Sequence, residues 1–493
     1  MAKRKTAKAA PKKKAKTSGS VRTTAAPRSV IELGNRRELF VDDYLIDRMH
    51  GIELRLQKPV PRNEAIVHDA PWEGNTSGYH TVFQDGSLFR MYYRGSMYHQ
   101  WATRGRPVVC YAESRDGKEW YRPELGLVSF MGSKRNNIIW DGPGSLNFTP
   151  FRDTNPACRK GEEYKALGSP HAGSQEEQAL VAFKSPDGVH WDLISDKPVM
   201  DHTTGVNVFD SQNVSFWDPA RDCYVEFHRD SIYPDGVRYR QIMTCTSKDY
   251  RRWTKQQLLD YGDAPLEHLY TNAVNPYYRA PHIYMGFPKR FVPERSLVGC
   301  TAGGMSDGLF MTSRDGLHFK RWEEAFMRPG LQRCRWENRN NMTAKGILET
   351  ENDLPTAPKE LSIFSSEGFY DTTAQLRRYT LRLDGFVAAN APRKGGELVT
   401  HPFTFEGEAL NLNVSTSVGG SARVEIQDAD GKVLKGYGLS DCDEIYGDFL
   451  DLRVSWKGAA DLRHLAGKPL RLRFTLSDAD LYSLRFGFVR GPR

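Results

Sequence analysis

Five polar stretches of the chain carry the side chains that could do chemistry. They contain Glu73, Asp153, Asp210, Glu267 and Glu337, each in a short run rich in Asn, Gln, His, Arg and aromatic residues. Two carboxyl groups can cleave a glycosidic bond when one protonates the leaving oxygen and the other attacks the anomeric carbon or activates water. From this chemistry we predict catalytic roles for four of them, Glu73, Asp153, Asp210 and Glu337.

The residues around these carboxylates suit a sugar, because aromatic rings offer flat faces and amide or guanidinium groups offer planar hydrogen-bond donors. Burying so many polar groups without partners is costly, so we expect them to face a wet pocket. The predicted substrate-binding side chains are Trp72, Asn75, His80, Arg152, Gln212, Tyr270, Asn272 and Asn338. The sequence has no metal-ligand spacing and no phosphate-binding glycine loop followed by Lys, so we expect neither a metal nor another cofactor.

A repeated turn motif indicates which elements position these stretches. Ser114-Arg-Asp-Gly-Lys-Glu-Trp120 recurs in related form at 185–191, 247–253 and 313–319, always with an aromatic residue four positions after the Asp. Residues 383–386, Leu-Asp-Gly-Phe, form a degenerate fifth copy, and the Asp residues are spaced by 62 to 71 positions. A period of that length indicates an array of supersecondary units. The Asp-Gly pair suits a tight turn after a strand, so the motif itself is structural.

Each copy follows an apolar or alternating strand, with a second strand and a polar strand upstream, which gives about four strands per unit. Five such units that close on themselves make a five-bladed β-propeller, since closure removes exposed sheet edges. The polar stretches would then be innermost strands that line a central channel. After Gly395 long alternating strands replace the motif and predict a β-sandwich. The predicted fold is therefore all-β, with a five-bladed β-propeller over 36–392 followed by a C-terminal β-sandwich over 393–493.

This pattern of turn motifs followed by a sandwich resembles the fructosidase-like and arabinosidase-like glycoside hydrolases of families 32, 43, 62 and 68, with family 130 as a phosphorolytic relative. The segments 39–47, 71–76 and 148–156 also resemble a mostly uncharacterised bacterial family-32-like group. The resemblance implies an Asp in blade one, an Asp in blade two and a Glu in blade three. Residues 151–156 approach the Arg-Asp-Pro motif of the second blade, which suggests Asp153 as the transition-state stabiliser. The motifs of the first and third blades are missing. Glu73, or the more distal Asp42 and Asp43, would have to supply the carboxylate of the first blade, and Asp210 that of the third.

The predicted function is a glycoside hydrolase with a carbohydrate substrate, and two alternatives remain open. Arg94, Arg152, Arg229 and Arg279, with His80, could surround a phosphate by charge-assisted hydrogen bonds, as a glycoside phosphorylase requires. A propeller that lacks the usual motifs of two blades could also bind glycans without cleaving them. A six-bladed sialidase fits less well, since five repeats are counted and no set of three arginines can be assigned to a sugar carboxylate.

Composition limits the partners of the chain. The net charge of +8 comes from residues 1–30, which hold ten Lys and Arg and no acid, so we expect a disordered basic tail that contacts nucleic acid only non-specifically. No stretch is apolar enough to span a membrane, and the start lacks the apolar centre of a secretory signal, which favours a cytoplasmic protein. Seven widely spaced cysteines without a CxxC motif indicate neither a disulfide framework nor a zinc site.

Overall fold

The computed structural model describes residues 30–99, 102–170, 178–202, 208–297, 299, 303–371 and 374–488. The predicted basic tail, residues 1–30, lies outside this range except for Val30. The described residues contain β-strands and three short 3-10 helices, which are η1 (Pro234–Gly236), η2 (Arg333–Arg335) and η3 (Arg463–Leu465). No helix in these ranges has the length and apolar character needed to cross a membrane.

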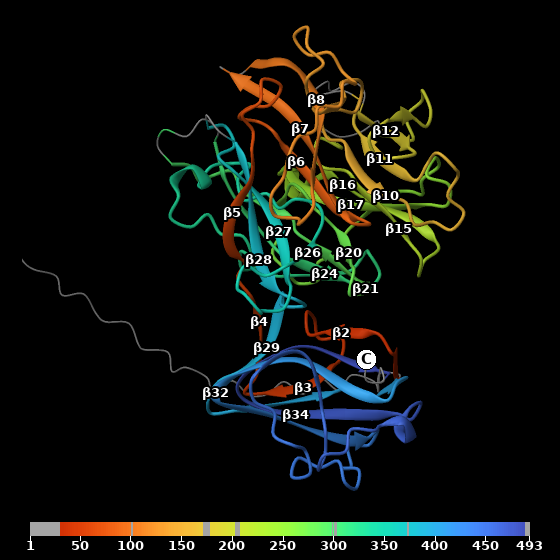
Figure 1. Ribbon diagram of the computed structural model, residues 1–493, viewed down its shortest axis with the longest axis vertical. Helices are drawn as coiled ribbons and strands as arrows, with labels where there is room; N and C mark the ends of the chain where they lie inside the picture. The colour runs from red at the N-terminus through yellow and green to blue at the C-terminus, as the bar shows by residue number, and fades with distance from the viewer. Residues whose placement is uncertain are drawn as a thin grey trace, which may run out of the picture.

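Five antiparallel sheets, which we call blades 1 to 5, follow one another along the chain (Figure 1). Blade 1 contains β6 (Gly78–Asp85), β7 (Leu88–His99), β8 (Ala102–Ser114) and β9 (Ile138–Trp140). Blade 2 contains β10 (Thr149–Arg152), β11 (Tyr164–Gly168), β12 (Gln178–Ser185) and β13 (Asp192–Leu193), with β14 (Met200–His202) paired to β12. Blade 3 contains β15 (Val214–Asp218), β16 (Cys223–Ile232), β17 (Tyr239–Ser247) and β18 (Gln257–Leu258).

Blade 4 contains β20 (Asn275–Tyr277), β21 (Ala280–Gly286), β24 (Met311–Ser313) and β25 (Phe319–Arg321). A separate three-stranded sheet of β19 (His268–Leu269), β22 (Lys289–Val292) and β23 (Met305–Gly308) is interleaved with it in the sequence. Blade 5 contains β26 (Leu348–Thr350), β27 (Glu360–Glu367), β28 (Gln375–Arg382) and, as its outer strand, β5 (Val60–Val67). A strand that precedes blade 1 thus completes blade 5, which ties the start of the ring to its end.

The first strands of the blades lie toward the centre of the ring. Strand β6 contacts both β10 and β26, and β10 contacts β15. Thr81 of β6 also forms an isolated bridge with Lys345, just before β26. These contacts between the first and last blades close the structure into a propeller, as the turn repeats predict.

The turn motifs have the structural role expected of them. In the first copy, Asp116 Oδ1 accepts hydrogen bonds from the backbone N–H groups of Lys118 and Glu119, at 2.8 and 3.0 Å. Ser114 Oγ accepts from the Gly117 N–H at 2.9 Å, and Gly117 has a φ of 72°. The other three full copies repeat this pattern at 185–188, 247–250 and 313–316. The motif therefore fixes the turns of the blades.

The remaining strands form a ten-stranded sheet at the opposite end of the molecule (Figure 1). From the C-terminal region it takes β29 (Val387–Ala391), β30 (Gly396–Thr400), β31 (Phe403–Phe405), β32 (Ala409–Asp428), β33 (Asp448–Arg453) and β34 (Leu470–Gly487). From the N-terminal region it takes β1 (Ile31–Gly34), β2 (Arg37–Leu39), β3 (Ile46–His50) and β4 (Glu53–Leu56). This pairing corrects the predicted boundaries of 36–392 and 393–493, because residues 31–56 and β29 belong to the sandwich. The propeller, from β5 to β28, is inserted between two parts of the sandwich.

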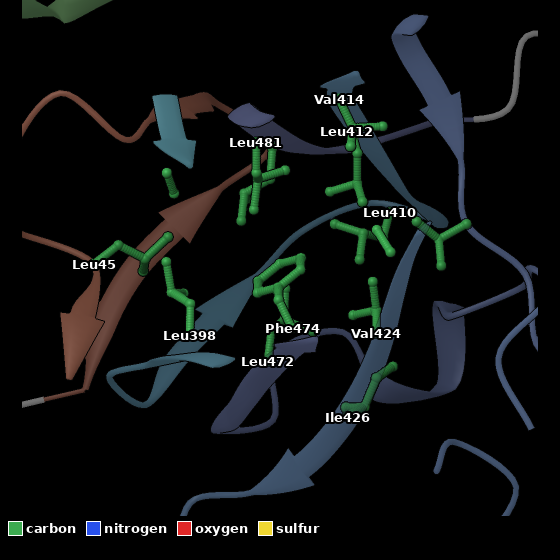
Figure 2. Close-up of a cluster of buried hydrophobic side chains, with 14 of the residues drawn as sticks. Leu45, Leu398, Leu410, Leu412, Val414, Val424, Ile426, Leu472, Phe474 and Leu481 are labelled. Atoms are coloured by element: carbon green, nitrogen blue, oxygen red, sulfur yellow. The ribbon is translucent and has the colours of Figure 1, made fainter. Parts of the chain in front are cut away.

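The sandwich encloses an apolar core. Figure 2 shows side chains of the long strands β32 and β34 meeting those of the N-terminal segment and β30. The labelled members are Leu45, Leu398, Leu410, Leu412, Val414, Val424, Ile426, Leu472, Phe474 and Leu481. Ile31, Leu33 and Phe40 belong to the same buried cluster, and burying these apolar side chains is the physical reason why the N-terminal strands join this sheet.

Asp384 connects the two domains. It lies in the degenerate fifth turn, is fully buried, and sits 3.2 Å from Arg37 and 2.8 Å from Arg279. It also accepts hydrogen bonds from Tyr277 and Ser483. Although burial alone would raise the pKa of Asp384, these two arginines hold it below the usual value. A buried carboxylate with this many donors fixes the position of the sandwich on the propeller.

Candidate functional site

A cavity of about 190 Å³ lies where the segments before several first strands come together. Its described lining consists of Asp210, Arg229, Arg240, Tyr270, Phe291, Asn338 and Arg339. Asp210 comes shortly before β15, Tyr270 before β20, and Asn338 and Arg339 before β26. The chain therefore supplies the wall from the N-terminal ends of the first strands of blades 3, 4 and 5, together with β16, β17 and β22. Two aromatic rings and a set of polar groups give this wall the character of a sugar site.

Tyr270 is surrounded by cations. Lys289 Nζ lies 4.1 Å from the centre of its ring, and the guanidinium carbons of Arg229 and Arg339 lie 4.7 and 5.9 Å away. Burial raises the pKa of Tyr270, but the charges of Arg339 and Arg229 outweigh it, so the pKa lies below its ordinary value. Tyr270 thus loses its proton more readily than an ordinary tyrosine does.

The pKa of Tyr79 is shifted in the opposite direction. Its hydroxyl lies 3.3 Å from the Tyr270 hydroxyl, and both side chains are buried. Burial, followed by the charges of Tyr270 and Asp210, raises the pKa of Tyr79 well above the usual value. Neighbouring titratable groups whose pKa values are pushed apart mark an acid and a base in many active sites. Tyr79 therefore keeps its proton more firmly than an ordinary tyrosine, and Tyr270 loses its proton more readily.

Cations outnumber carboxylates in and around this cavity. Lys289 is fully buried and donates to Asn338 Oδ1 at 2.9 Å. Burial, together with Arg339, Arg240 and Arg229, lowers the pKa of Lys289 well below its ordinary value. Asp210, whose side chain is 38% exposed, is the one carboxylate in the described lining, and its Oδ2 lies 3.3 Å from Arg229 Nη2.

Arg94 lies behind Tyr79. It is buried, its guanidinium carbon is 4.7 Å from the Tyr79 ring centre, and it donates two hydrogen bonds to the Thr76 carbonyl at 3.2 and 2.6 Å. This arginine adds positive charge to the same region without being part of the described cavity wall.

Backbone strain is concentrated next to the site. Tyr79, Phe209, Arg339 and Tyr370 have φ values of 55°, 61°, 70° and 72°, in the left-handed region that non-glycine residues rarely adopt. Each such residue costs roughly 1 to 3 kcal/mol, and such residues cluster at functional sites. The surrounding packing holds these strained residues in place, and it thereby orients Tyr79, Arg339 and the neighbouring Asp210.

Three of the predicted site residues line the cavity: Asp210, Tyr270 and Asn338. Gln212 and Asn272 are buried nearby but hold the ring together instead. Gln212 Nε2 donates to the carbonyls of Tyr79 and His80, and Asn272 Nδ2 donates to those of Gln212 and Phe227. Their amides connect blades 1, 3 and 4, so the cost of burying them is offset by these hydrogen bonds.

Four predicted residues of the 72–80 stretch are engaged inside blade 1. Trp72 Nε1 donates to Asn137, and Asn75 is bound to the backbone of Tyr98. His80 is buried against His68, with 3.0 Å between their Nε2 atoms, and burial lowers its pKa well below the usual value. Glu73 is buried and accepts hydrogen bonds from Tyr93 and Arg122. None of the four is in the described cavity wall.

Arg152 ends β10 and Asp153 follows it, so both lie at the C-terminal end of a first strand, whereas the cavity lies at the N-terminal ends. Asp153 is fully buried, 2.5 Å from Lys165 Nζ and 2.8 Å from the Tyr224 hydroxyl. Arg152 is exposed and pairs with Asp85 at 3.0 Å. The fold thus separates the predicted stabiliser Asp153 from Asp210. Glu337 is buried beside Asn338 and is not part of the described wall.

Arg240, Lys289, Phe291 and Arg339 are site residues that the sequence analysis does not predict. Arg339 stands next to the predicted Asn338, so the polar stretch 336–341 is the signal that could have found it. Lys289 and Phe291 lie on β22, which is a strand outside the blade repeat, and nothing local distinguishes them. Within the described ranges, no group of three His, Cys, Asp or Glu residues could hold a metal ion.

Comparison with known proteins gives remote structural neighbours. No family model and no curated protein matches the chain. A solved glycoside hydrolase is 13% identical, covers 66% of this chain and 92% of its own, and has a TM-score of 0.46. An α-L-arabinanase from Penicillium chrysogenum is 10% identical over 66% of this chain and 99% of its own, with a TM-score of 0.40. A GH32 β-fructofuranosidase from Bombyx mori is 11% identical over 87% and 96%, with a TM-score of 0.42. These are glycoside hydrolases of the kind that the turn motifs resemble, and at this identity they assign no activity to the chain.

Proposed function

We propose that the protein is a glycoside hydrolase that works in the cavity at the N-terminal ends of the first propeller strands. The observation that carries the proposal is the pair Tyr79 and Tyr270, whose pKa values lie on opposite sides of the ordinary one, where Tyr270 and Asp210 line the same cavity. A phenolate can act as the nucleophile of a glycosidase in place of a carboxylate.

In the proposed reaction, the Tyr270 oxygen attacks the anomeric carbon while the bond to the leaving oxygen breaks. That oxygen takes its proton from solvent, and the Asp210 carboxylate acts in the second step. Water then attacks the tyrosyl-linked sugar, Asp210 takes a proton from the water, and Tyr270 leaves as the phenolate. Two displacements at one carbon retain its configuration, so the product should have the anomeric form of the substrate.

Phosphorolysis is a second candidate, because Arg229 lines the cavity and Arg94 lies behind it. Arg152 and Arg279, the other arginines considered for a phosphate, pair with Asp85 and Asp384 elsewhere. Hydrolysis is therefore the better-supported reaction.

The test is a panel of aryl glycosides incubated with the full chain, with and without inorganic phosphate. Hydrolysis predicts free sugar without phosphate, and NMR of the first product should show retained configuration. Sugar 1-phosphate formed only with added phosphate would favour the second candidate. Glycan binding without turnover of any glycoside would mean that the propeller is a binding module.

A further inference from the structure

We infer that the sugar bound in this cavity carries an acidic group, so that the substrate class is an anionic glycoside such as a uronide. This inference rests on the proposed function, since it names the substrate of the same site. It starts from an imbalance of charge in the wall.

Three guanidinium groups and a buried lysine meet in a small volume whose described lining holds one carboxylate. Arg229, Arg240 and Arg339 line the cavity, Lys289 lies against Tyr270, and Asp210 pairs with Arg229. Burying like charges together is unfavourable, and a folded protein keeps them where a ligand supplies the opposite charge. An oxyanion on the substrate would provide that charge.

The other two arginines of the wall, Arg339 and Arg240, have donors to offer. Arg339 is packed against aromatic faces, with its guanidinium carbon 5.6 Å from the Phe369 ring centre and 5.7 Å from that of Tyr370. Arg240 lies over Phe291 at 5.1 Å. Among the described residues, the buried Nε atoms of Arg339 and Arg240 have no hydrogen-bond partner. Such buried donors call for an explanation, and guanidinium groups match the planar oxygens of a carboxylate.

The other features of the wall favour an acidic sugar over a simple inorganic anion. Tyr270 and Phe291 supply ring faces, and Asn338 supplies an amide that already accepts from Lys289. The volume of about 190 Å³ is below the roughly 300 to 1,000 Å³ typical of ligand pockets, which suits a single sugar ring. Binding the acidic group at the arginines would hold the ring beside Tyr270, where its anomeric carbon is needed.

The first test measures binding to the full chain by calorimetry, with glucuronate and galacturonate compared with glucose and galactose. We expect the acids to bind at least 10-fold more tightly, and raised salt to weaken only their binding. Arg339→Gln and Arg240→Gln should each remove most of this preference, while Arg135→Gln, at an exposed arginine, should leave it unchanged. Equal affinity for acid and neutral sugars would overturn the inference.

Two further ligands, tested in the same binding experiment, identify which kind of molecule supplies the oxyanion. Glucose 6-sulfate binding better than the uronates would keep the anionic class but assign a sulfated sugar. Inorganic phosphate that binds tightly while no acidic sugar does would overturn the inference in favour of a phosphate site.

A turnover assay separates this inference from the proposed function. Aryl uronides and matched neutral aryl glycosides are compared at equal concentration, and we expect the uronides to be cleaved preferentially. Equal cleavage of uronides and neutral glycosides would support the glycosidase but contradict the acidic substrate. Selective binding of acids without any cleavage would keep the anion site and remove the glycosidase.

Discussion

The hydroxyl groups of Tyr79 and Tyr270 lie 3.3 Å apart, and their surroundings shift their pKa values in opposite directions. Tyr270 is flanked by Arg229 and Arg339, whereas Tyr79 is affected by the negative charges of Tyr270 and Asp210. Two identical side chains thereby acquire different chemical roles from their neighbours alone.

Tyr270→Phe should reduce kcat by on the order of 100-fold or more, because it removes the nucleophilic oxygen while keeping the ring. The melting temperature should change little, since the lost hydrogen bond is one of a pair of hydroxyls. Saturation kinetics and a thermal melt check this. Tyr278→Phe, at an exposed tyrosine bound to Glu349, is the control. Unchanged kcat in Tyr270→Phe would remove Tyr270 from the reaction.

Arg339→Gln should move the pH dependence of kcat to higher pH. Activity that requires the Tyr270 phenolate rises as the pH passes upward through its pKa, and loss of the nearby cation raises that pKa. The kcat of the variant, measured against pH at saturating substrate, gives the shift. If the rising part of the kcat curve stays at the wild-type pH, it reports the ionisation of a group other than Tyr270.

Asp153→Asn tests the residue that the sequence resemblance favours and the fold separates from the cavity. It removes the nearer carboxylate from the buried Lys165 and leaves it only Glu162, at 3.6 Å, and breaking a buried pair costs up to about 3 to 5 kcal/mol. We expect a lower melting temperature with kcat largely intact. Arg152→Gln, which breaks an exposed pair worth about 0 to 1 kcal/mol, is the matched control. A collapse of kcat in a stable Asp153→Asn variant would return Asp153 to the site.

Glu73 should make the fold sensitive to acid. Burial would raise its pKa, but His68, Arg122 and Tyr93 lower it from 4.5 to about 2. A depressed pKa contributes stability that is present above about pH 4.5 and is lost as the pH falls toward 2, and a shift of this size corresponds to on the order of 3 kcal/mol.

Denaturant unfolding of the wild type and of Glu73→Gln at several pH values measures this contribution. The variant should be less stable at neutral pH and should lose less stability on acidification. Parallel curves for the two proteins between pH 4.5 and 2 would contradict the assignment.

Local chemistry in the sequence predicts much of the propeller but only part of the site. The hydrogen bonds of Asp116 and its equivalents are made within three residues, so a turn can be read directly from the motif. The same repeat predicts that Asp210 and Asn338 lie in the polar stretches near the centre of the ring. The sequence groups Asp153 with Asp210 because the two ends of a four-residue strand look alike in a sequence, and Asp153 is not in the described cavity wall. Lys289 becomes a site residue only through a strand outside the repeat.

The insertion of the propeller into the sandwich has a consequence for how the chain folds. Arg37 donates to Ser483, 446 positions later, and β1 pairs with β31 across the whole propeller. Contacts between such distant positions form slowly, because a long loop must close before any contact compensates its entropy. The sandwich is therefore expected to be the last region to gain hydrogen-exchange protection during refolding. In synthesis from the N-terminus, strands β1 to β4 must wait for nearly the entire chain before their partners exist.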